Sequence, residues 1–238
     1  MSIEEFEEKM LERLKTSDHF DFDEFEKKIL SMEEEKTERY IRRKKRELIQ
    51  TNLGDFYAGG VVYAESYLSE LGNELGKENT HLDYIAMINM GSKKISFRTI
   101  HDHIDVSAIA AKYGGGGHQK AAGCSLTLDA YKQFVVDTFH IEPIPEDAKR
   151  NRYNVKGGST FGTFYKNQQD EMFMLYSNDK VDWIIEKNNT PLTQTFASFN
   201  EAEWFLKRNN QVWLVRDDLF VDYLMREVNK VRHLHKGM

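Results

Sequence analysis

The chain has 238 residues, of which 40% are hydrophobic and 30% charged, and its 33 basic and 39 acidic residues give a net charge of −6. This composition is typical of a globular chain with one large or two small domains, and it excludes a protein that coats nucleic acid through bulk positive charge. A single cysteine, Cys124, excludes an internal disulfide, and no apolar run reaches the roughly 18 residues of a spanning helix, so we expect a cytoplasmic protein without a membrane partner.

The first part of the chain is predicted to be helical. Apolar residues recur there at three- and four-residue spacing among Glu and Lys, and we assign residues 1–52 to a helical connector. Asp21 and Asp23 are the expected caps between two helices. The basic run at residues 39–46 has two interpretations: it grips phosphates or acidic lipid, or, more commonly, it is a solvated helix face paired with nearby glutamates.

Strands and helices alternate between residues 53 and 142, which predicts an α/β domain with a mixed sheet. The expected strands lie at 56–64, 84–90, 94–99 and 124–128, with a hairpin turn at residues 91–92. Three helices are expected. The first is capped by Ser66 and weakened at its end by Gly72 and Gly76, the second spans 106–113 and is capped by Asp105, and the third spans 130–139.

Pro143 and Pro145 open a polar hinge that separates a second part, residues 150–238. We expect a small accessory α+β domain there. Its expected elements are a three-stranded meander at 161–165, 172–176 and 181–185, a helix at 200–207 capped by Asn200, a strand at 212–215 and a helix at 221–234. Aromatic residues of the meander either form core, the commoner case, or stack on bases; they are Phe161, Phe164, Phe173, Tyr176 and Trp183.

Four consecutive glycines, Gly114–Gly117, carry the most specific signal. Glycine lets successive backbone N–H groups form a concave anion site and lets a ligand approach the main chain. His118 and Lys120 supply donors at its edge, and a helix N-terminus emerging at residues 121–122 would add partial positive charge. The guanidinium of Arg98 matches two phosphate oxygens. The residues alone leave two equal readings: a phosphate site, or a flexible turn beside a surface arginine.

The run Gly114-Gly115-Gly116-Gly117-His118, followed two residues later by Ala121-Ala122-Gly123 and preceded by Ser96-Phe97-Arg98, resembles the DHH-associated domain of the DHH phosphoesterase superfamily. The resemblance covers roughly residues 52–140. Together with the flanking helices and the extra C-terminal part, it is most similar to bacterial oligoribonucleases of the NrnB kind. The resemblance implies that Arg98 and His118 hold substrate phosphate and that Gly115, Gly116 and Gly117 let the chain approach it.

The chain departs from this superfamily in one large respect. It contains no Asp-His-His motif, and we find no Asp-x-Asp element in the setting that would hold the metals. The resemblance implies that two Mn²⁺ ions bind in a separate N-terminal DHH domain, which we expect to be the partner of this chain. We therefore expect the substrate-binding half of a phosphodiesterase, a hydrolase acting on short RNA or a small nucleotide such as adenosine bisphosphate. By itself the chain is expected to bind no metal, to hold no catalytic residue and to be inactive.

An alternative is a non-catalytic RNA- or tRNA-binding module, since a related domain ends alanyl-tRNA synthetases. His118 directly after the glycines favours the phosphoesterase branch, because the synthetase form has arginine there. The segment His101-Asp102-His103-Ile104-Asp105 contains ligand-type residues, but adjacent loop residues rarely converge on one ion, so a polar loop is favoured over a metal site. Cys124 is expected to be a small buried apolar residue.

Overall fold

The computed structural model describes residues 2–16, 21–53, 57–177 and 182–236, with side chains up to residue 226. These residues form helices and two sheets, of six and five strands, which confirms the predicted α/β and α+β fold class. The chain divides into two compact units, residues 1–40 and 41–238. The predicted division into residues 1–52, 53–142 and 150–238 remains a prediction. Predictions on Phe56, Asn178, Asp179 and Val181 lie outside the described residues.

The first unit consists of α1 (Ile3–Thr16) and most of α2 (Glu24–Lys45). Asp23 caps α2 as predicted: its Oδ1 accepts from the Glu26 N–H at 2.8 Å, and Glu26 Oε2 accepts from the Asp23 N–H at 2.9 Å. Asp21 does not cap, because its carboxylate pairs with Lys27 instead, at 3.0 Å. No helix in the described ranges is both long and apolar enough to cross a bilayer.

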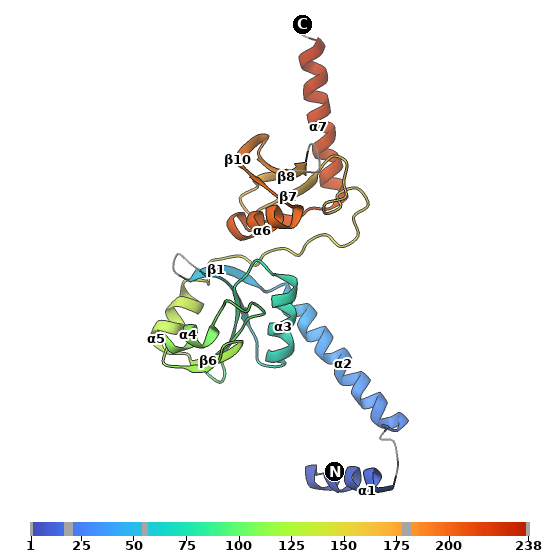
Figure 1. Ribbon diagram of the computed structural model, residues 1–238, viewed down its shortest axis with the longest axis vertical. Helices are drawn as coiled ribbons and strands as arrows, with labels where there is room; N and C mark the ends of the chain where they lie inside the picture. The colour runs from blue at the N-terminus through green and yellow to red at the C-terminus, as the bar shows by residue number, and fades with distance from the viewer. Residues whose placement is uncertain (1, 17–20, 54–56, 178–181, 237–238) are drawn as a thin grey trace. The chain divides into compact units, whose positions relative to one another are not determined.

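The first sheet has the order β1-β2-β3-β4-β6-β5 (Figure 1). Its strands are β1 (Ile49–Leu53), β2 (Tyr57–Tyr63), β3 (Tyr84–Asn89), β4 (Lys94–Arg98), β5 (Gly116–His118) and β6 (Ala121–Ser125). The pair β2–β3 is parallel and the other described pairs are antiparallel. The prediction of helix up to residue 50 is wrong, because buried Ile49 and Leu53 join the sheet as an edge strand.

Helices cover both faces of this sheet (Figure 1). On one side lies α3 (Leu68–Glu78), which contacts β3 and β4. On the other lie α4 (Val106–Ala111) and α5 (Leu128–Tyr131), the latter continuing as the π-helix η1 (Lys132–Val136). The main core forms on this second side, where Phe97 packs edge-on against Phe134, with ring centroids 5.5 Å apart. Cys124 is buried in this core as predicted, and burial raises the pKa of its thiol.

One prediction about α3 is wrong. Its N-cap is Tyr67 in the left-handed region, with φ 51°, and not Ser66. The helix continues through Gly72 and Gly76 to Glu78, and both glycines are buried where the helix meets the sheet. A side chain at either position would meet the neighbouring β4 strand or the loop after it.

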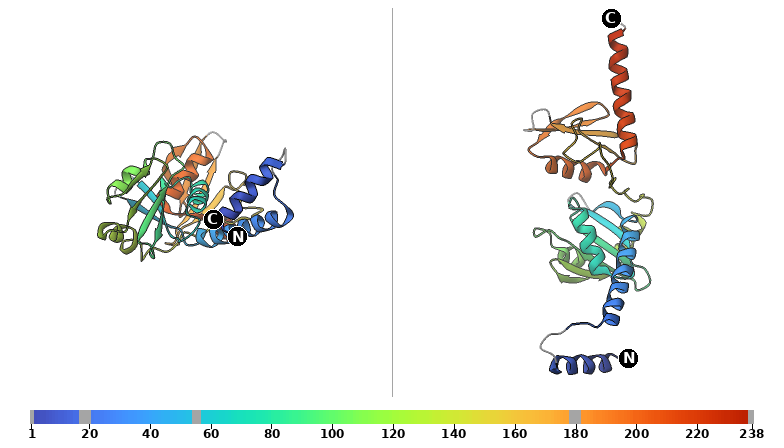
Figure 2. Two further views of the ribbon diagram at one scale, coloured as in Figure 1. Left: turned by 90° about the horizontal axis from the view of Figure 1, so that it is seen from below. Right: turned by 90° about the vertical axis from the view of Figure 1, so that its right-hand side faces the viewer.

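The second sheet has the order β10-β9-β8-β7-β11 and is covered by α6 (Phe199–Asn210). Its strands are β7 (Thr163–Lys166), β8 (Met172–Ser177), β9 (Trp183–Lys187), β10 (Thr190–Phe196) and β11 (Trp213–Leu214). The predicted meander is present, but β10 was not predicted, and the cap of α6 is Ser198, not Asn200. The final helix, α7 (Asp217–Lys236), extends beyond this sheet (Figure 2).

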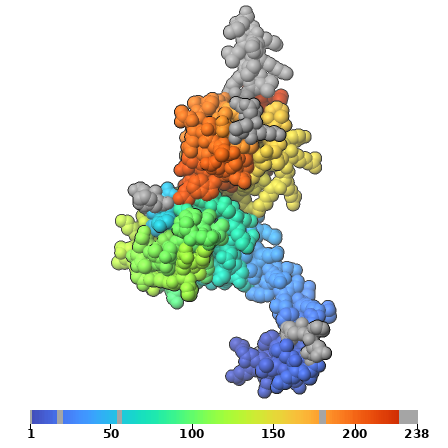
Figure 3. Space-filling model, viewed as in Figure 1, coloured from blue at the N-terminus to red at the C-terminus, as the bar shows by residue number. Residues whose placement is uncertain are grey.

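Within the second unit, α6 contacts the loop that leads into β3 of the first sheet, and the space-filling view shows the two regions against each other (Figure 3). The guanidinium of Arg208 binds both carboxylate oxygens of Asp83 at 3.0 and 2.8 Å and the carbonyl of His81 at 3.0 Å. The indole N–H of Trp204 donates to the carbonyl of Thr80 at 3.3 Å. The two sheets are therefore joined by hydrogen bonds as well as by the segment at residues 143–150.

Candidate phosphate-binding site

The last two glycines of the run lie in an edge strand, whereas Gly114, in a turn, and Gly115 precede it. Gly116–His118 pairs antiparallel with Ala121–Gly123, so β5 and β6 form a tight hairpin around residues 119–120. The expected helix N-terminus at Ala121 is wrong, because Ala121 and Ala122 pair with Arg98 and Phe97 of β4. Any anion bound here therefore meets side chains and strand backbone, without the positive end of a helix at Ala121.

Strand register places two of the predicted site residues in one row. Arg98 of β4 pairs with Ala121 of β6, and Ala121 pairs with His118 of β5. Paired residues of antiparallel strands project to the same face, so Arg98 and His118 share a face with a small alanine between them. At about 4.8 Å per strand their backbones lie roughly 10 Å apart, a span that a phosphate and two long side chains bridge.

The face that carries this row is half covered. Ile95 and Phe97 point into the core beneath α4 and η1, so strand alternation directs Ser96 and Arg98 to the α3 side. There α3 contacts β3 and β4, while His118 and Gly116 on β5 are exposed. Among the described residues, no hydrogen-bond partner is found for the His118 ring. The imidazole is therefore available to a ligand.

The four positions of the run differ in why the structure requires glycine there. Gly114 has φ 74°, a conformation that favours glycine. A Cβ on Gly115 would lie 2.2 Å from the Gly123 carbonyl oxygen, and one on Gly117, which has φ 146°, would lie 2.6 Å from the Ala122 Cα. Gly116 has neither constraint: its φ is not positive, and a Cβ there would meet nothing within 4 Å. Its bare backbone faces open space beside His118.

Lys120 lies apart from this row. Its ammonium donates to the carbonyl of Ile100 at 3.0 Å and pairs with Asp102 at 2.7 Å. The hydrogen bond from Lys120 lowers the pKa of the Asp102 carboxyl. Lys120 therefore fixes the loop after β4 in this structure, and a phosphate would have to compete with Asp102 for it.

The histidine cluster after β4 has structural contacts. The ring Nε2 of His101 is 2.9 Å from the carbonyl oxygen of Leu82, and the His101 and His103 ring centroids are 5.4 Å apart. Asp105 caps α4 as predicted, accepting from the N–H groups of Ser107 and Ala108. Across the part of the chain that the structure describes, no group of three His, Cys, Asp or Glu side chains is placed to hold a metal ion.

Sequence reasoning missed two residues around Arg98. Ser69 Oγ accepts from Arg98 Nη2 at 3.2 Å, and a Cβ on Gly72 would lie 2.6 Å from Arg98 Cγ. Both residues are on α3, 26 or more positions away in sequence. A glycine inside a helix was the available signal, since such a glycine often marks a close packing contact.

Two lysines of the basic run form ion pairs with acidic residues, as the commoner interpretation predicted, but Lys44 is buried rather than solvated. Lys45 pairs with Glu74 and Glu78 of α3 at 3.4 and 2.7 Å, and Lys44 pairs with Glu47 at 2.7 Å. These pairs hold the end of α2 beside α3. The run therefore gives no reason to assign it a phosphate or lipid ligand.

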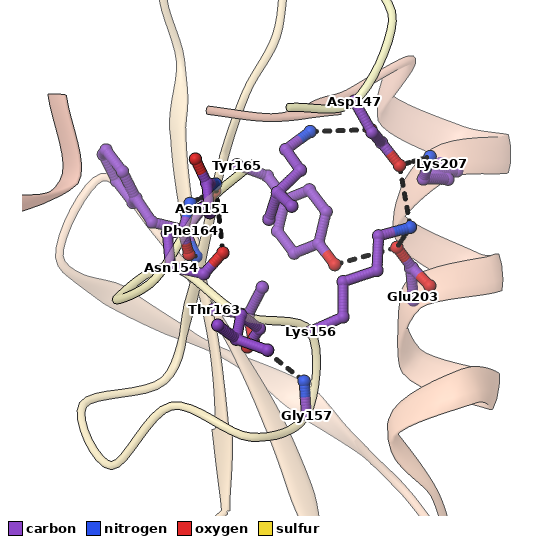
Figure 4. A network of polar contacts seen from close by, with 12 residues as sticks. Asp147, Asn151, Asn154, Lys156, Gly157, Thr163, Phe164, Tyr165, Glu203 and Lys207 are labelled. Atoms are coloured by element: carbon purple, nitrogen blue, oxygen red, sulfur yellow. Dashed lines mark hydrogen bonds and ion pairs between the residues drawn. The ribbon is translucent and has the colours of Figure 1, made fainter. Parts of the chain in front are cut away.

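The second sheet has a charge-balanced polar network (Figure 4). Asp147 binds Lys156 at 2.7 Å and Lys207 at 2.6 Å, and Lys156 also binds Glu203, which accepts from the Tyr165 hydroxyl at 2.9 Å. Burial raises the pKa of Asp147, but the two lysines outweigh it and hold the pKa at about 2. Phe164 and Phe173 are buried, which confirms the core interpretation for these two aromatics. Phe161 is 67% exposed.

Comparison with known proteins gives two matches in sequence. Residues 162–233 match the family model of the oligoribonuclease NrnB C-terminal domain. Over 236 residues the chain is 53% identical to oligoribonuclease NrnB of Bacillus subtilis (strain 168), an alignment that covers 99% of this chain and 58% of that protein. The chain thus spans less than two thirds of the length of this relative. The expected resemblance to oligoribonucleases of the NrnB kind is confirmed, and the DHH superfamily fits these matches.

Two solved structures share a smaller part of the chain. An uncharacterised protein from Helicobacter pylori G27 is 22% identical, with a TM-score of 0.31 over 36% of this chain and 26% of that one. A pGpG-specific phosphodiesterase, PggH of Vibrio cholerae, is 15% identical, with a TM-score of 0.29 over 44% of this chain and 37% of that one.

Proposed function

We propose that this chain is the substrate-binding portion of a DHH-family phosphodiesterase that degrades short oligoribonucleotides or related small nucleotides in the bacterial cytoplasm. The observation that carries the proposal is the row Arg98–Ala121–His118 on a half-open sheet face. The similarity to an oligoribonuclease over nearly the whole chain supports the same substrate class.

Each group of this row has a chemical role in the proposal. Arg98 presents a planar fork of N–H donors that matches two oxygens of one phosphate. The exposed imidazole of His118 donates to the same phosphate from the far side of Ala121. Gly116 leaves the strand backbone open to the ligand, while Gly115 and Gly117 keep β5 close to β6. Lys120 contacts the phosphate only when the phosphate displaces Asp102 from its ammonium group.

Hydrolysis itself is assigned to a separate DHH domain with two Mn²⁺ ions. Metal ions of this kind supply a hydroxide nucleophile and stabilise the leaving oxygen. The described residues of this chain do not fit such ions, because the His101–Asp105 segment makes structural contacts instead. In the proposal this chain binds and orients the substrate, and by itself it does not cleave it.

The proposal is tested by calorimetric titration of the chain with a 5′-phosphorylated diribonucleotide. We expect Arg98→Ala and His118→Ala each to weaken binding at least roughly tenfold, since a charge-assisted hydrogen bond contributes about 1.5–3 kcal/mol. Lys149→Ala is the matched control, because its exposed ammonium pairs with Glu146 outside the row. The same samples are assayed for Mn²⁺-dependent hydrolysis, and none is expected.

Three outcomes would count against the proposal. Unchanged binding in both variants would remove the phosphate site from this row. Hydrolysis by the purified chain would assign catalysis to residues within it. Tight binding of tRNA with none of the dinucleotide would favour the alternative, a non-catalytic RNA-binding module.

A further inference from the structure

The side chain of Arg98 lies against α3 along its whole length. Its Cβ and Cγ occupy the space next to Gly72, where a helix Cβ would lie 2.9 and 2.6 Å from them. At its far end, Nη2 donates to the hydroxyl of Ser69, one turn earlier on the same helix, at 3.2 Å. The stem and the head of the arginine are thus held by two residues of one helical face.

This arrangement restricts a side chain that is otherwise flexible. Arginine has several rotatable bonds, and part of its rotamer entropy is lost whenever its guanidinium is fixed by a ligand. A donor that is already oriented loses less of it on binding. Arg98 is half-buried rather than free in solvent, which agrees with a restrained side chain.

The restraint leaves donors available. A guanidinium has five N–H groups. Within the described residues, Arg98 uses one on the Phe97 carbonyl at 3.0 Å and one on Ser69. The remaining N–H groups have no protein acceptor there, and next to Arg98 in the row Ala121 is partly exposed and His118 is exposed.

We propose that Ser69 and Gly72 are positioning residues that set the orientation of Arg98 toward the substrate phosphate: Gly72 makes room for its stem, and Ser69 holds its guanidinium. The inference rests on the proposed function, because it assigns a role to α3 at that same site. It adds a helix to a site that the motif residues place only on strands.

The test uses the intact chain and the 5′-phosphorylated diribonucleotide, with calorimetry for affinity and thermal unfolding for stability. Ser69→Ala removes the acceptor, and Ser69→Thr keeps it. Gly72→Ala forces the arginine stem to move, whereas Gly76→Ala, one turn later, meets only Ile100 at 3.0 Å and serves as its control. Ser69→Ala is also combined with Arg98→Ala, so that coupling between the two is measured.

We expect Ser69→Ala and Gly72→Ala each to weaken binding roughly three- to tenfold, less than Arg98→Ala does, because the guanidinium remains but the ligand then has to order it. Ser69→Thr and Gly76→Ala should bind like the unmodified chain, and Ser69→Ala should have no further effect once Arg98 is alanine. A role confined to the stability of α3 would instead change the melting temperature and leave the affinity unchanged, which would overturn the inference.

The remaining outcomes separate this inference from the proposed function. If Arg98→Ala weakens binding but Ser69→Ala and Gly72→Ala do not, only the positioning role is overturned. If Ser69→Ala weakens binding equally with and without Arg98, it acts on another group, and the inference also fails. If Arg98→Ala has no effect, or the unmodified chain does not bind, the proposed function fails and takes the inference with it.

Discussion

The glycines before His118 illustrate how one residue type serves two purposes in adjacent positions. Gly115 is required by space, because the Gly123 carbonyl oxygen lies 2.2 Å from where its Cβ would be. Gly116 is required by neither space nor backbone conformation, and its Cα faces the solvent beside the candidate site. Packing therefore explains the first glycine, and ligand approach is the explanation that the site offers for the second.

A pair of substitutions separates these purposes. Gly115→Ala should lower the free energy of unfolding by about 1–3 kcal/mol, as overpacking against backbone does. Gly116→Ala should leave it unchanged within about 0.5 kcal/mol, the usual range for surface positions, while weakening dinucleotide binding. Urea unfolding and calorimetry measure the two effects. A Gly116→Ala variant with full affinity would show that the ligand does not approach this backbone.

At the residue scale, the sequence predicted the site residues that belong to a recognisable local motif. The motif residues Arg98 and His118 were predicted, and strand register brings them into one row. Ser69 was not predicted, because its contact with Arg98 depends on how α3 packs on the sheet and leaves no local pattern. Lys120 was predicted as a phosphate donor, but its partner Asp102 is visible only once the loop after β4 is folded.

Among the elements, α6 shows how a cap is chosen by geometry rather than by residue type. Ser198 has extended backbone, and its hydroxyl accepts from the Glu201 N–H at 3.2 Å, while Glu201 Oε2 accepts from the Ala197 N–H at 3.1 Å. Asn200, the cap predicted from sequence, lies inside the first turn. Two residue types that both cap helices stood two positions apart, and only the start of the helix distinguishes them.

Ser198→Ala should therefore destabilise the second unit by about 1 kcal/mol, because an N–H at the start of α6 loses its acceptor. Asn200→Ala is the matched control and should cost less than about 0.5 kcal/mol. Urea denaturation followed by circular dichroism measures both. Equal losses in the two variants would contradict the assignment of the cap.

The strands that were missed have identifiable physical causes. β1 follows the basic end of α2 without a proline or glycine break, so the helix was predicted to continue to residue 50, into the start of this strand. β10 is an edge strand with Pro191 near its start and mostly exposed residues, and it lacks the alternation that predicts a half-buried strand. The strand after the glycines was expected at residues 124–128, but pairing with β4 places it at Ala121–Ser125.

At the scale of the whole second unit, one ion pair joins the two sheets. Arg208 of α6 binds both carboxylate oxygens of Asp83. The side chain of Arg208 is 20% exposed and that of Asp83 is 10% exposed, and Asp83 also accepts from the Ala58 N–H at 2.8 Å. Arg208→Ala would leave a largely buried carboxylate without its cation, so we expect a loss of roughly 2–4 kcal/mol.

The exposed pair Arg226–Asp222 provides the comparison. Its side chains are 74% and 54% exposed, so Arg226→Ala should cost less than about 1 kcal/mol. Chemical denaturation of both variants measures the difference. If Arg208→Ala were as mild as Arg226→Ala, the contact between the sheets would not contribute to stability.

The pH dependence of stability should come from His81, which is 6% exposed between the two sheets. Burial, then the positive charges of Lys207 and Arg208, lower its pKa from 6.5 to about 3, although the carboxylate of Asp147 opposes this. Between these values the unfolded chain binds a proton that the folded chain does not, so stability falls as the pH falls below about 6.5. At pH 5 the loss should be about 2 kcal/mol.

Replacing the histidine tests this directly. His81→Gln should remove most of the decline between pH 6.5 and 4.5, whereas His140→Gln, at an exposed position, should leave it in place. Urea unfolding across this range gives the slope. A decline that is the same in both variants would assign the pH dependence to other groups.

The contact between the two sheet regions also has a consequence for cleavage of the backbone between them. Cleavage in the segment at residues 143–150 leaves the Asp83 carboxylate and the carbonyls of Thr80 and His81 on one fragment, and their donors, Arg208 and Trp204, on the other. Each fragment then has a set of polar groups whose geometry matches that of the other. The two pieces are thus suited to fragment complementation, in which separately produced halves reassociate through their own matched hydrogen bonds.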